Sequence, residues 1–305
     1  MKLSIVIPTK DRPQLVIETL NAVADAVKGV DNEVLVVNDS EKPLILPDTL
    51  TNVVTVLRNP KAGVASARNF GAKNATGELL LFIDDDMLIQ AEDIQTTFRL
   101  HEKYQRCCIN LNWIYPPERS AKIAQTPFGR YLIHYGFTSL KGWNRGNDWN
   151  DEELFVTHGI TSQYLSMAKR DFNESGGYNE VFPHAGFEDY EFAKRLQALG
   201  FTFYIYPKSR LFHNESDRLD INAWLDRRRR GGATRKVAVG LGYQEVAISY
   251  SFTKKIILNV LSFFSPLIQF VVRRLPNKTA FDSIYFRIVN ILLTVAIYEG
   301  YNSKK

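Results

Sequence analysis

Three consecutive aspartates, Asp84, Asp85 and Asp86, follow the apolar run Leu79–Ile83 in this chain of 305 residues. Adjacent carboxylates repel one another, so the cluster is costly unless a cation or a set of hydrogen bonds compensates it. One interpretation is a solvated loop that caps the next helix, because Asp is favoured at helix starts. The other is a divalent-metal site, because hard cations prefer carboxylate oxygens as ligands. The rest of the chain has to distinguish the two.

A second pair of acids, Glu188 and Asp189, precedes the apolar residues Phe192, Leu196 and Leu199. This spacing predicts a helix with both acids in its first turn. Acids there complement the helix dipole, which is the purely structural interpretation. A carboxylate beside a pocket can also accept a proton from an attacking hydroxyl, and the Gly-rich segment before this helix is suited to shape a pocket.

Short apolar runs alternate with amphipathic stretches in the first third of the chain. They predict strands over residues 3–7, 34–37, 53–57 and 79–83, and helices over residues 14–27 and 64–74. Strands that are apolar on both faces and alternate with helices are typical of an α/β fold with a parallel sheet covered by helices. Ligands bind beyond the carboxyl ends of such strands. We therefore expect Pro8–Arg12, Asn38–Ser40 and the three aspartates along one edge of the sheet.

Four segments resemble, in order, the signatures of the inverting family 2 glycosyltransferases: SIVIPTKDR, VLVVNDS, GVASARNFGAKNATGELLLFIDDD and GFEDYEFAKRL. Several ordered motifs are far more specific than one acidic triplet. The resemblance covers residues 1–215 and implies a GT-A, Rossmann-like α/β fold with a mixed, mostly parallel sheet flanked by helices. It leaves residues 216–305 as a basic, C-terminal helical extension. The activity it implies is transfer of a hexosyl or N-acetylhexosaminyl group from a nucleotide-sugar, with inversion.

The resemblance also implies which residues bind the donor, a UDP-sugar. They are Pro8, Thr9, Asp11, Arg12, Asp39, Arg68, Asp84 and Asp85. Asp39 would accept a hydrogen bond from the imide N–H of uracil, because an ionised carboxylate only accepts. The structural alternative for Asp39 is an Asx turn. Arg68 corresponds to a position near the diphosphate, whereas an arginine on a helix is more commonly a surface residue.

The family's D-x-D motif corresponds to Asp84 and Asp86, with Asp84 nearer the ribose and Asp86 on a divalent metal ion. Three acids in a row leave this register ambiguous by one position, so Asp85 could share either role. His213 ends the strand-like run FTFYIYPKSRLFH and corresponds to a histidine that completes the metal shell in several members. An imidazole beside carboxylates suits Mn²⁺ better than Mg²⁺. The alternative is a structural or exposed histidine.

Within the resemblance, Asp189 is the catalytic base and Glu188 an acceptor-binding neighbour. Two alternatives from other classes remain. A metal-dependent nucleotidyltransferase or phosphohydrolase would also use acids at strand ends, but the chain has no phosphate-cradling G-x-x-x-x-G-K sequence and no acid pair on its first strand. A non-catalytic nucleotide-sugar-binding module would keep the fold without the acids, and all of these acids are present.

Cysteine usage and the N-terminal sequence indicate where the protein works. Cys107 and Cys108 are the only cysteines and are adjacent, which excludes a disulfide framework and favours a reducing compartment. The apolar stretch Leu3–Ile7 ends at Pro8 and is too short for the core of a signal peptide. We expect a cytoplasmic enzyme that acts on a saccharide or lipid-linked acceptor in surface polysaccharide or glycolipid synthesis, without a nucleic-acid partner.

The last third of the chain is rich in Arg and Lys and poor in acids, within a net charge of +5. Between Lys255 and Arg273 lie 17 mostly apolar residues, interrupted by Pro266, and a second apolar segment contains Arg287. Basic flanks and short apolar faces favour interfacial helices on the inner face of the cell membrane over spanning ones. The alternative is a helical subdomain packed on the catalytic domain, or on a second copy in a homodimer.

Residues 115–153 show no clear period and are expected to be irregular. Trp143 and Trp149 in this segment could stack on a sugar ring or form a small satellite core.

Overall fold

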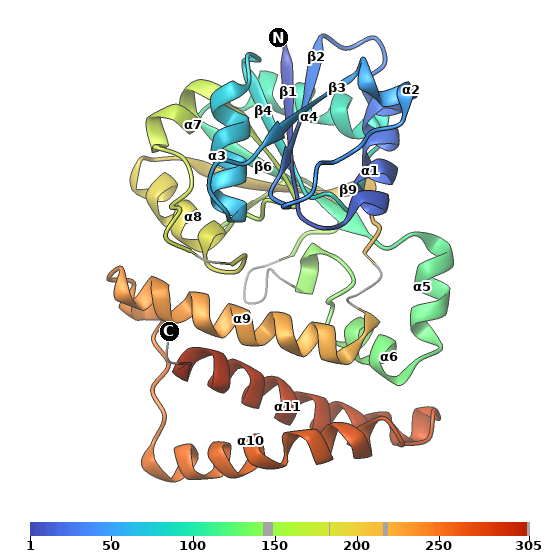
Figure 1. The fold of residues 1–305 in the computed structure, drawn as a ribbon, viewed down its shortest axis with the longest axis vertical. Helices are drawn as coiled ribbons and strands as arrows, with labels where there is room; N and C mark the ends of the chain where they lie inside the picture. The colour runs from blue at the N-terminus through green and yellow to red at the C-terminus, as the bar shows by residue number, and fades with distance from the viewer. Residues whose placement is uncertain (143–148, 183, 216–218, 304–305) are drawn as a thin grey trace. The chain divides into compact units, whose positions relative to one another are not determined.

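The computed structural model describes residues 1–142, 149–182, 184–215 and 219–303, which fold into two compact units (Figure 1). The first unit contains Met1–Pro116, Thr138–Glu180 and Glu188–Glu215, and the second contains Pro117–Phe137, Val181–Phe187 and Ser216–Lys305. The division into a catalytic domain over residues 1–215 and an extension over 216–305 stays a prediction. Trp143 lies outside the described residues.

A nine-stranded sheet forms the centre of the first unit. Eight strands follow the order β3-β2-β1-β4-β8-β6-β9-β5, and β7 pairs with β9. The strands are β1 (Leu3–Thr9), β2 (Asn32–Asn38), β3 (Val54–Arg58), β4 (Leu79–Ile83), β5 (Met87–Leu88), β6 (Cys107–Ile114), β7 (Phe155–Thr157), β8 (Tyr164–Ala168) and β9 (Thr202–His213).

Four neighbouring strands, β3, β2, β1 and β4, run parallel. Every residue of β1 and β4 is buried, as expected for strands that are apolar on both faces. Val6 of β1 pairs with Leu35 of β2 and Phe82 of β4, so the carboxyl ends of these strands lie along one edge. β8 then runs antiparallel beside β4, which makes the sheet mixed. The predicted fold class is confirmed.

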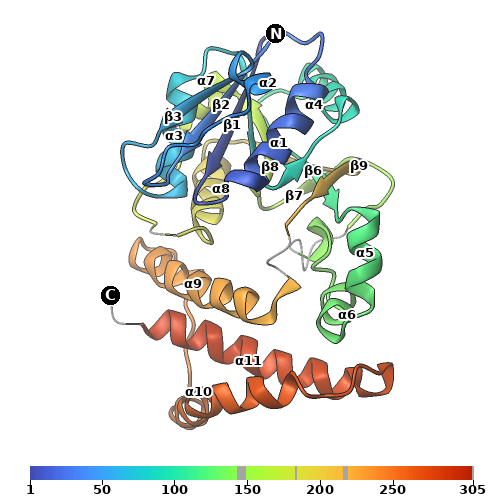
Figure 2. The same cartoon turned by 45° about the vertical axis from the view of Figure 1, so that its right-hand side comes forward.

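Helices cover both faces of the sheet (Figure 2). One face carries α1 (Pro13–Ala26) and α4 (Ala91–Lys103); the other carries α3 (Val64–Asn74), α7 (Lys169–Ser175) and α8 (Glu188–Ala198), and the short α2 (Asp48–Thr51) precedes β3. A Cβ at Gly71 would collide with the side chain of Val6, so this glycine lets α3 pack closely on β1. The six segments predicted as strands and helices agree with the structure within two residues at each end.

An aromatic cluster fixes the position of α8. Phe192 has no exposed surface, and its ring centroid lies 4.3 Å from that of Tyr178 and 5.8 Å from that of Phe172. Leu196, about one turn later, is also fully buried. Truncation of a buried Phe to Ala costs about 3–5 kcal/mol of folding free energy, which indicates how firmly this face is held. The packing thereby sets the place of the first turn of α8.

The second unit is helical. Its helices are α5 (Pro117–Ala124), α6 (Pro127–His134), α9 (Ile221–Gly240), α10 (Phe252–Val272) and α11 (Asp282–Asn302), with short 3₁₀ segments at Gln244–Val246 and Thr279–Phe281. The expectation of an irregular segment is wrong for α5 and α6. The signals were local: Pro117 and Pro127 begin the two helices, and the Thr126 hydroxyl accepts a hydrogen bond from the Gly129 N–H at 2.9 Å.

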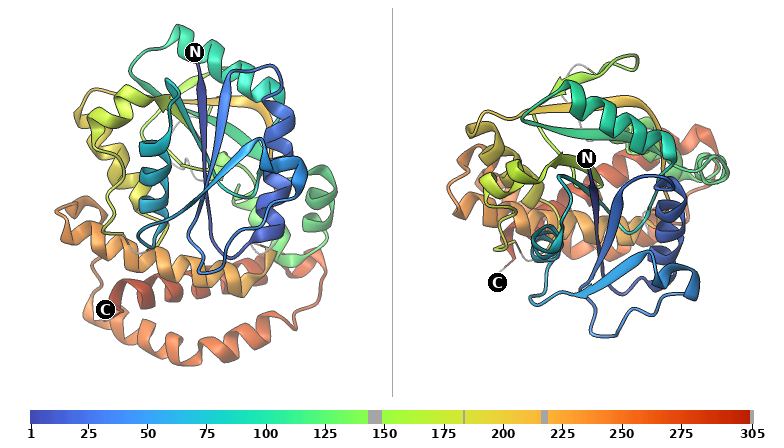
Figure 3. Two further views of the ribbon diagram at one scale, coloured as in Figure 1. Left: turned by 45° about the horizontal axis from the view of Figure 1, so that its top comes forward. Right: turned by 90° about the horizontal axis from the view of Figure 1, so that it is seen from above.

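Helix α11 contacts both α9 and α10 (Figure 3). Two glycines permit the close approach of α9 and α11. A Cβ at Gly300 would collide with the carbonyl of Arg229, and a Cβ at Gly232 would lie 2.5 Å from the carbonyl oxygen of Ile297. Gly232 of α9 and Gly300 of α11 therefore have a packing function, whereas a Cβ at Gly231 would meet nothing within 4 Å.

Candidate active site

The acids that the sequence singles out lie at the edge formed by the carboxyl ends of β1, β2 and β4. Asp84–Asp86 connect β4 to β5, and β5 pairs with the end of β9 so that Met87 lies opposite His213. β8 begins at the same edge because it runs antiparallel to β4; the Asp84 N–H donates to the carbonyl of Gln163 at 3.3 Å. The expectation that the strand-end groups share one edge is confirmed.

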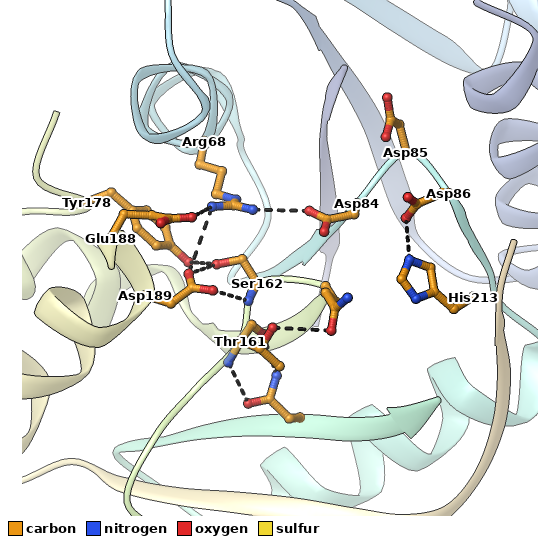
Figure 4. Close-up of polar contacts among 12 residues, drawn as sticks. Arg68, Asp84, Asp85, Asp86, Thr161, Ser162, Tyr178, Glu188, Asp189 and His213 are labelled. Atoms are coloured by element: carbon orange, nitrogen blue, oxygen red, sulfur yellow. Dashed lines mark hydrogen bonds and ion pairs between the residues drawn. The ribbon is translucent and has the colours of Figure 1, made fainter. Parts of the chain in front are cut away.

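The side chains of Asp84, Asp85 and Asp86 point in different directions (Figure 4). Asp84 Oδ1 accepts a hydrogen bond from Arg68 at 3.1 Å. Asp86 Oδ1 lies 3.2 Å from Nε2 of His213. Asp85 points away from both of these partners. The three carboxylates therefore do not converge on one point, which reduces the repulsion among their charges.

Asp85 is held inside the first unit, with no exposed surface. Its carboxylate accepts a hydrogen bond from the Thr9 hydroxyl at 2.5 Å and pairs with Arg12, which also donates to Asp86 at 3.2 Å. Burial raises the pKa of Asp85 to about 7, while the Arg12 guanidinium opposes this shift. Burial alone would lower the pKa of Arg12, yet the carboxylates of Asp85 and Asp86 raise it above its ordinary value. This pair ties the end of β4 to the end of β1.

A third buried acid, Glu215, forms a group with Asp86 and His213. One potential ligand atom from each lies within 4.8 Å of the others, and His213 Nε2 lies 3.4 Å from Glu215 Oε2. Among the described residues, neither ring nitrogen of His213 makes a hydrogen bond; the ring is held edge-on by Trp113 at 4.5 Å. One imidazole and two carboxylates form a donor set that fits Mn²⁺ or Mg²⁺.

Sequence reasoning did not select Glu215. The available signal was its i, i+2 spacing from His213, because residues at this spacing share one face of an extended segment. That Glu215, which lies beyond the end of β9, comes close to His213 and Asp86 is seen only in the structure.

Arg68 connects Asp84 to the acids of α8. The residue is only 3% exposed, so it is not the surface arginine that is common on helices. Nη1 donates to Glu188 Oε1 at 3.1 Å and lies 3.9 Å from Asp189 Oδ1. Burial alone would lower the pKa of Arg68, but the carboxylates of Asp189 and Asp84 raise it. The guanidinium is therefore a permanent positive charge among three acids.

Asp189 is held through both carboxylate oxygens by Ser162. The Ser162 N–H donates to Oδ2 at 3.1 Å, and the Ser162 hydroxyl, which lies 2.7 Å from the Tyr178 hydroxyl, donates to Oδ1 (Figure 4). Burial raises the pKa of Asp189, against the opposing effects of Arg68 and Ser162. The side chain nevertheless keeps 21% of its surface exposed, so it can reach a ligand. Ser162 lies just before β8, which is not one of the strands predicted from the sequence, so this contact is seen only in the structure.

Asp39 lies just beyond the end of β2. Its Oδ1 accepts a hydrogen bond from Asn59 at 2.6 Å and from the Gly63 N–H at 3.2 Å. The Asx turn belongs instead to Asn38, whose side-chain oxygen accepts a hydrogen bond from the Ser40 N–H at 3.0 Å. The carboxylate of Asp39 is thus held in place by neighbouring loops rather than by its own turn.

The other candidates for donor binding lie on β1 and just after it. Pro8 and Thr9 are buried at the end of the strand. Asp11 is exposed and has φ of 54°, and its N–H donates to the Ser40 hydroxyl at 2.7 Å. A positive φ is uncommon outside glycine, so this turn is constrained.

Trp149 contacts its own segment. Its indole N–H donates to Asp151 at 2.6 Å, and its ring lies 5.2 Å from that of Phe155. Both contacts are with residues that are close to Trp149 in the sequence.

Comparison with known proteins relates the chain to sugar-transferring enzymes. The chain matches the family model described as Glycosyl transferase family 2 over residues 4–172. An uncharacterized glycosyltransferase of Haemophilus influenzae is 27% identical over 206 residues, which are 66% of this chain and 64% of that protein. The match therefore spans less than two thirds of this relative.

Two solved structures are similar in fold. The mannosyltransferase PcManGT of Pyrobaculum calidifontis, in complex with GDP-Man and Mn²⁺, has a TM-score of 0.56 at 12% identity, over 99% of this chain and 88% of that one. GalNAc-T7 with UDP, GalNAc and Mn²⁺ has a TM-score of 0.51 at 16% identity, over 70% of this chain and 43% of that one.

Proposed function

Because the family match covers more than half of its residues, this chain belongs to glycosyl transferase family 2, and we propose that it transfers a sugar from a UDP-sugar to a saccharide or lipid-linked acceptor with inversion. The observation that supports this proposal most directly is the pair of acidic groups at one sheet edge. Asp86, His213 and Glu215 form one group, and Glu188 and Asp189 form the other around Arg68.

The donor set at this edge supports binding of a divalent cation. Asp86, His213 and Glu215 are buried, and one potential ligand atom from each lies within 4.8 Å of the others. Carboxylate oxygens and an imidazole nitrogen are ligands that Mn²⁺ accepts. A cation held by Asp86, His213 and Glu215 would supply positive charge that stabilises the leaving diphosphate.

Asp189 is proposed to act as the base. The acceptor hydroxyl oxygen forms a bond to the anomeric carbon, the bond from that carbon to the diphosphate breaks with its electron pair on the diphosphate, and the hydroxyl proton passes to Asp189. The raised pKa of the Asp189 carboxyl favours proton acceptance. Attack opposite the leaving group inverts the configuration. Glu188, bonded to Arg68, is proposed to bind the acceptor.

The nucleotide is proposed to lie beside Asp39, Pro8 and Thr9, with Asp84 near the ribose. A carboxylate is a suitable acceptor for the imide N–H of uracil. The two similar structures contain UDP in one case and GDP-Man in the other, each with Mn²⁺, so they support a nucleotide-sugar and a metal ion more strongly than they support uridine.

A donor-hydrolysis screen over UDP-, GDP- and dTDP-sugars tests the proposal. We expect the nucleoside diphosphate and free sugar from a UDP-sugar in Mn²⁺, and loss of hydrolysis in EDTA or in Asp86→Ala. Glu174→Gln, which removes one partner of an exposed ion pair, is the matched control. Release of pyrophosphate or of a nucleoside monophosphate would instead indicate a nucleotidyltransferase or a phosphohydrolase. Donor binding without any product, even with acceptors added, would indicate a binding module.

A further inference from the structure

Helix α10 carries an apolar stripe that faces away from the helices packed against it. The stripe consists of large side chains spaced three or four residues apart, of which Phe252 and Phe263 are 80% and 79% exposed. Its members are Phe252, Ile256, Ile257, Val260, Phe263, Phe264, Leu267, Phe270 and Val271. Soluble proteins rarely expose a contiguous apolar patch of this kind without an interaction that covers it.

The opposite side of α10 is already occupied by α11. Leu258 packs with Val295 and Tyr298 in a buried cluster, and the Tyr298 hydroxyl donates to Asn259 at 2.9 Å. The Ser262 hydroxyl donates to Glu299, which adds a second polar tie between the two helices. These contacts fix the rotation of α10, so the stripe cannot turn inward while they persist.

Positive charge flanks the stripe at both ends. Residues 251–278 contain five basic side chains and no acidic one; the five are Lys254, Lys255, Arg273, Arg274 and Lys278. The Arg274 guanidinium lies 3.5 Å from the ring centroid of the exposed Phe270, so apolar and cationic surface adjoin at one end of the helix.

This distribution of charge distinguishes between possible occupants. A second copy packed along the stripe, whether parallel or antiparallel, would bring basic ends against basic ends, which repel. An anionic lipid surface is complementary to both features, because phosphates attract the lysines and arginines while the acyl boundary accepts the aromatic and aliphatic side chains.

By length and composition alone, α10 and residues 279–302 could each cross a bilayer. In α10, however, only one side is an unpartnered apolar surface, since Asn259 and Ser262 bond to α11. A one-sided apolar stripe is the pattern of a helix that lies in the plane of the interface.

We propose that α10 binds the surface of an anionic bilayer, with its apolar stripe inserted at the boundary between headgroups and acyl chains and its basic ends on lipid phosphates. This inference is independent of the donor and of the reaction, since it rests on α10 and α11 alone.

Vesicle sedimentation of the full chain tests the proposal. We expect binding to phosphatidylcholine vesicles that contain phosphatidylglycerol, and weak binding to phosphatidylcholine alone. Phe263→Ser combined with Leu267→Ser should weaken binding by about 100-fold, because each of the two buried apolar side chains contributes a factor of about ten. Ile45→Ser, at an apolar residue that is 82% exposed in the first unit, is the matched control and should bind as the parent does.

A second set of variants tests the contribution of the basic side chains to vesicle binding. Replacing Lys254, Lys255, Arg273 and Arg274 by Gln should reduce binding to anionic vesicles by about tenfold or more and leave the weak binding to neutral vesicles unchanged. Added salt should reduce the binding of the parent protein in the same direction.

Two results would overturn the proposal. One is equal affinity of the parent and the stripe variant for anionic vesicles. The other is a stable dimer in solution without vesicle affinity, dissociated by Phe263→Ser, which would assign the stripe to a second copy. Donor hydrolysis measured on the same samples separates these outcomes from failure of the proposed function.

Discussion

Two acidic groups share one edge of the sheet but compensate their charge differently. Around Asp189, the chain supplies a permanent cation in Arg68 and two donors from Ser162. Around His213, two carboxylates face an imidazole, and Arg12 donates to Asp86 while it also pairs with the buried Asp85. The first group has internal donors on its carboxylates, whereas the second presents one imidazole and two carboxylates as a donor set that fits a divalent cation. We therefore expect the two groups to respond differently to removal of a metal or of a single carboxylate.

Removing a carboxylate from the second group should have the largest effect. Asp86→Ala should abolish transfer and weaken donor binding in Mn²⁺ far more than in EDTA. Mn²⁺ at a concentration about 100 times its Kd should stabilise the parent protein by about 2.7 kcal/mol, and this stabilisation should vanish in the variant. Calorimetry and thermal unfolding measure both effects. If the parent binds donor equally well in Mn²⁺ and in EDTA, the metal has no place at this edge.

In the first group, Asp189→Asn keeps the size of the side chain but removes proton acceptance. Turnover should fall by about 10²-fold or more, while donor affinity changes little. Steady-state kinetics and donor titration separate the two quantities. Near-normal turnover in this variant would indicate that Asp189 only stabilises the start of the helix. Glu188→Gln should have a milder effect, mainly on the KM for the acceptor.

The membership of Glu215 in the second group can be tested without catalysis. Glu215→Gln keeps the volume of the buried side chain but removes a negative charge, so Mn²⁺ affinity should fall by roughly 10-fold or more. Isothermal titration with Mn²⁺ and no donor measures this. Glu174→Gln, at an exposed acid, is the control. Unchanged affinity would leave the ion, if any, to Asp86 and His213.

Ser162 tests whether the first group needs its internal donors. Ser162→Ala removes a hydroxyl that bonds the ionised form of Asp189, so the pKa of that carboxyl should rise further. The base must be deprotonated to act, so the acidic limb of the kcat profile should move to higher pH, with kcat lowered by about tenfold and donor KM preserved. A uniform loss of activity at every pH would indicate a structural role instead.

His101 is a second buried histidine, outside the two acidic groups. Its substitution should have the smallest effect of those considered, a change in the pH dependence of folding stability. Burial lowers the pKa of His101 from 6.5 to about 4, and its Nε2 lies 2.9 Å from the Ser166 hydroxyl. The unfolded chain binds the proton first as pH falls, so stability is lost from about pH 6.5 down toward about pH 4, by about 1 kcal/mol between pH 7.5 and 5.5. Urea unfolding at the two pH values measures this, and His101→Gln should flatten the dependence.

Local sequence was sufficient for the first half of the fold. The strands and helices around β1, β2 and β4 follow from runs of apolar residues whose period depends only on neighbouring positions. The predicted edge of the sheet follows as well, since parallel strands bring their carboxyl ends together. Helices α5 and α6 also have local signals, because a proline begins each of them and Thr126 caps the second.

By itself, the sequence determined the types of chemistry available: carboxylates at strand ends, a histidine at the end of a strand, and an apolar segment with basic flanks. The tertiary structure alone decided how these groups combine. Asp85 differs from its neighbours because it is held by both Arg12 and the Thr9 hydroxyl. Asp189 differs from an ordinary helix-start acid because it accepts hydrogen bonds from Ser162, which precedes the antiparallel strand β8. The physical reason is that burial and charge compensation are set by partners distant in the chain, and a local pattern contains no information about those partners.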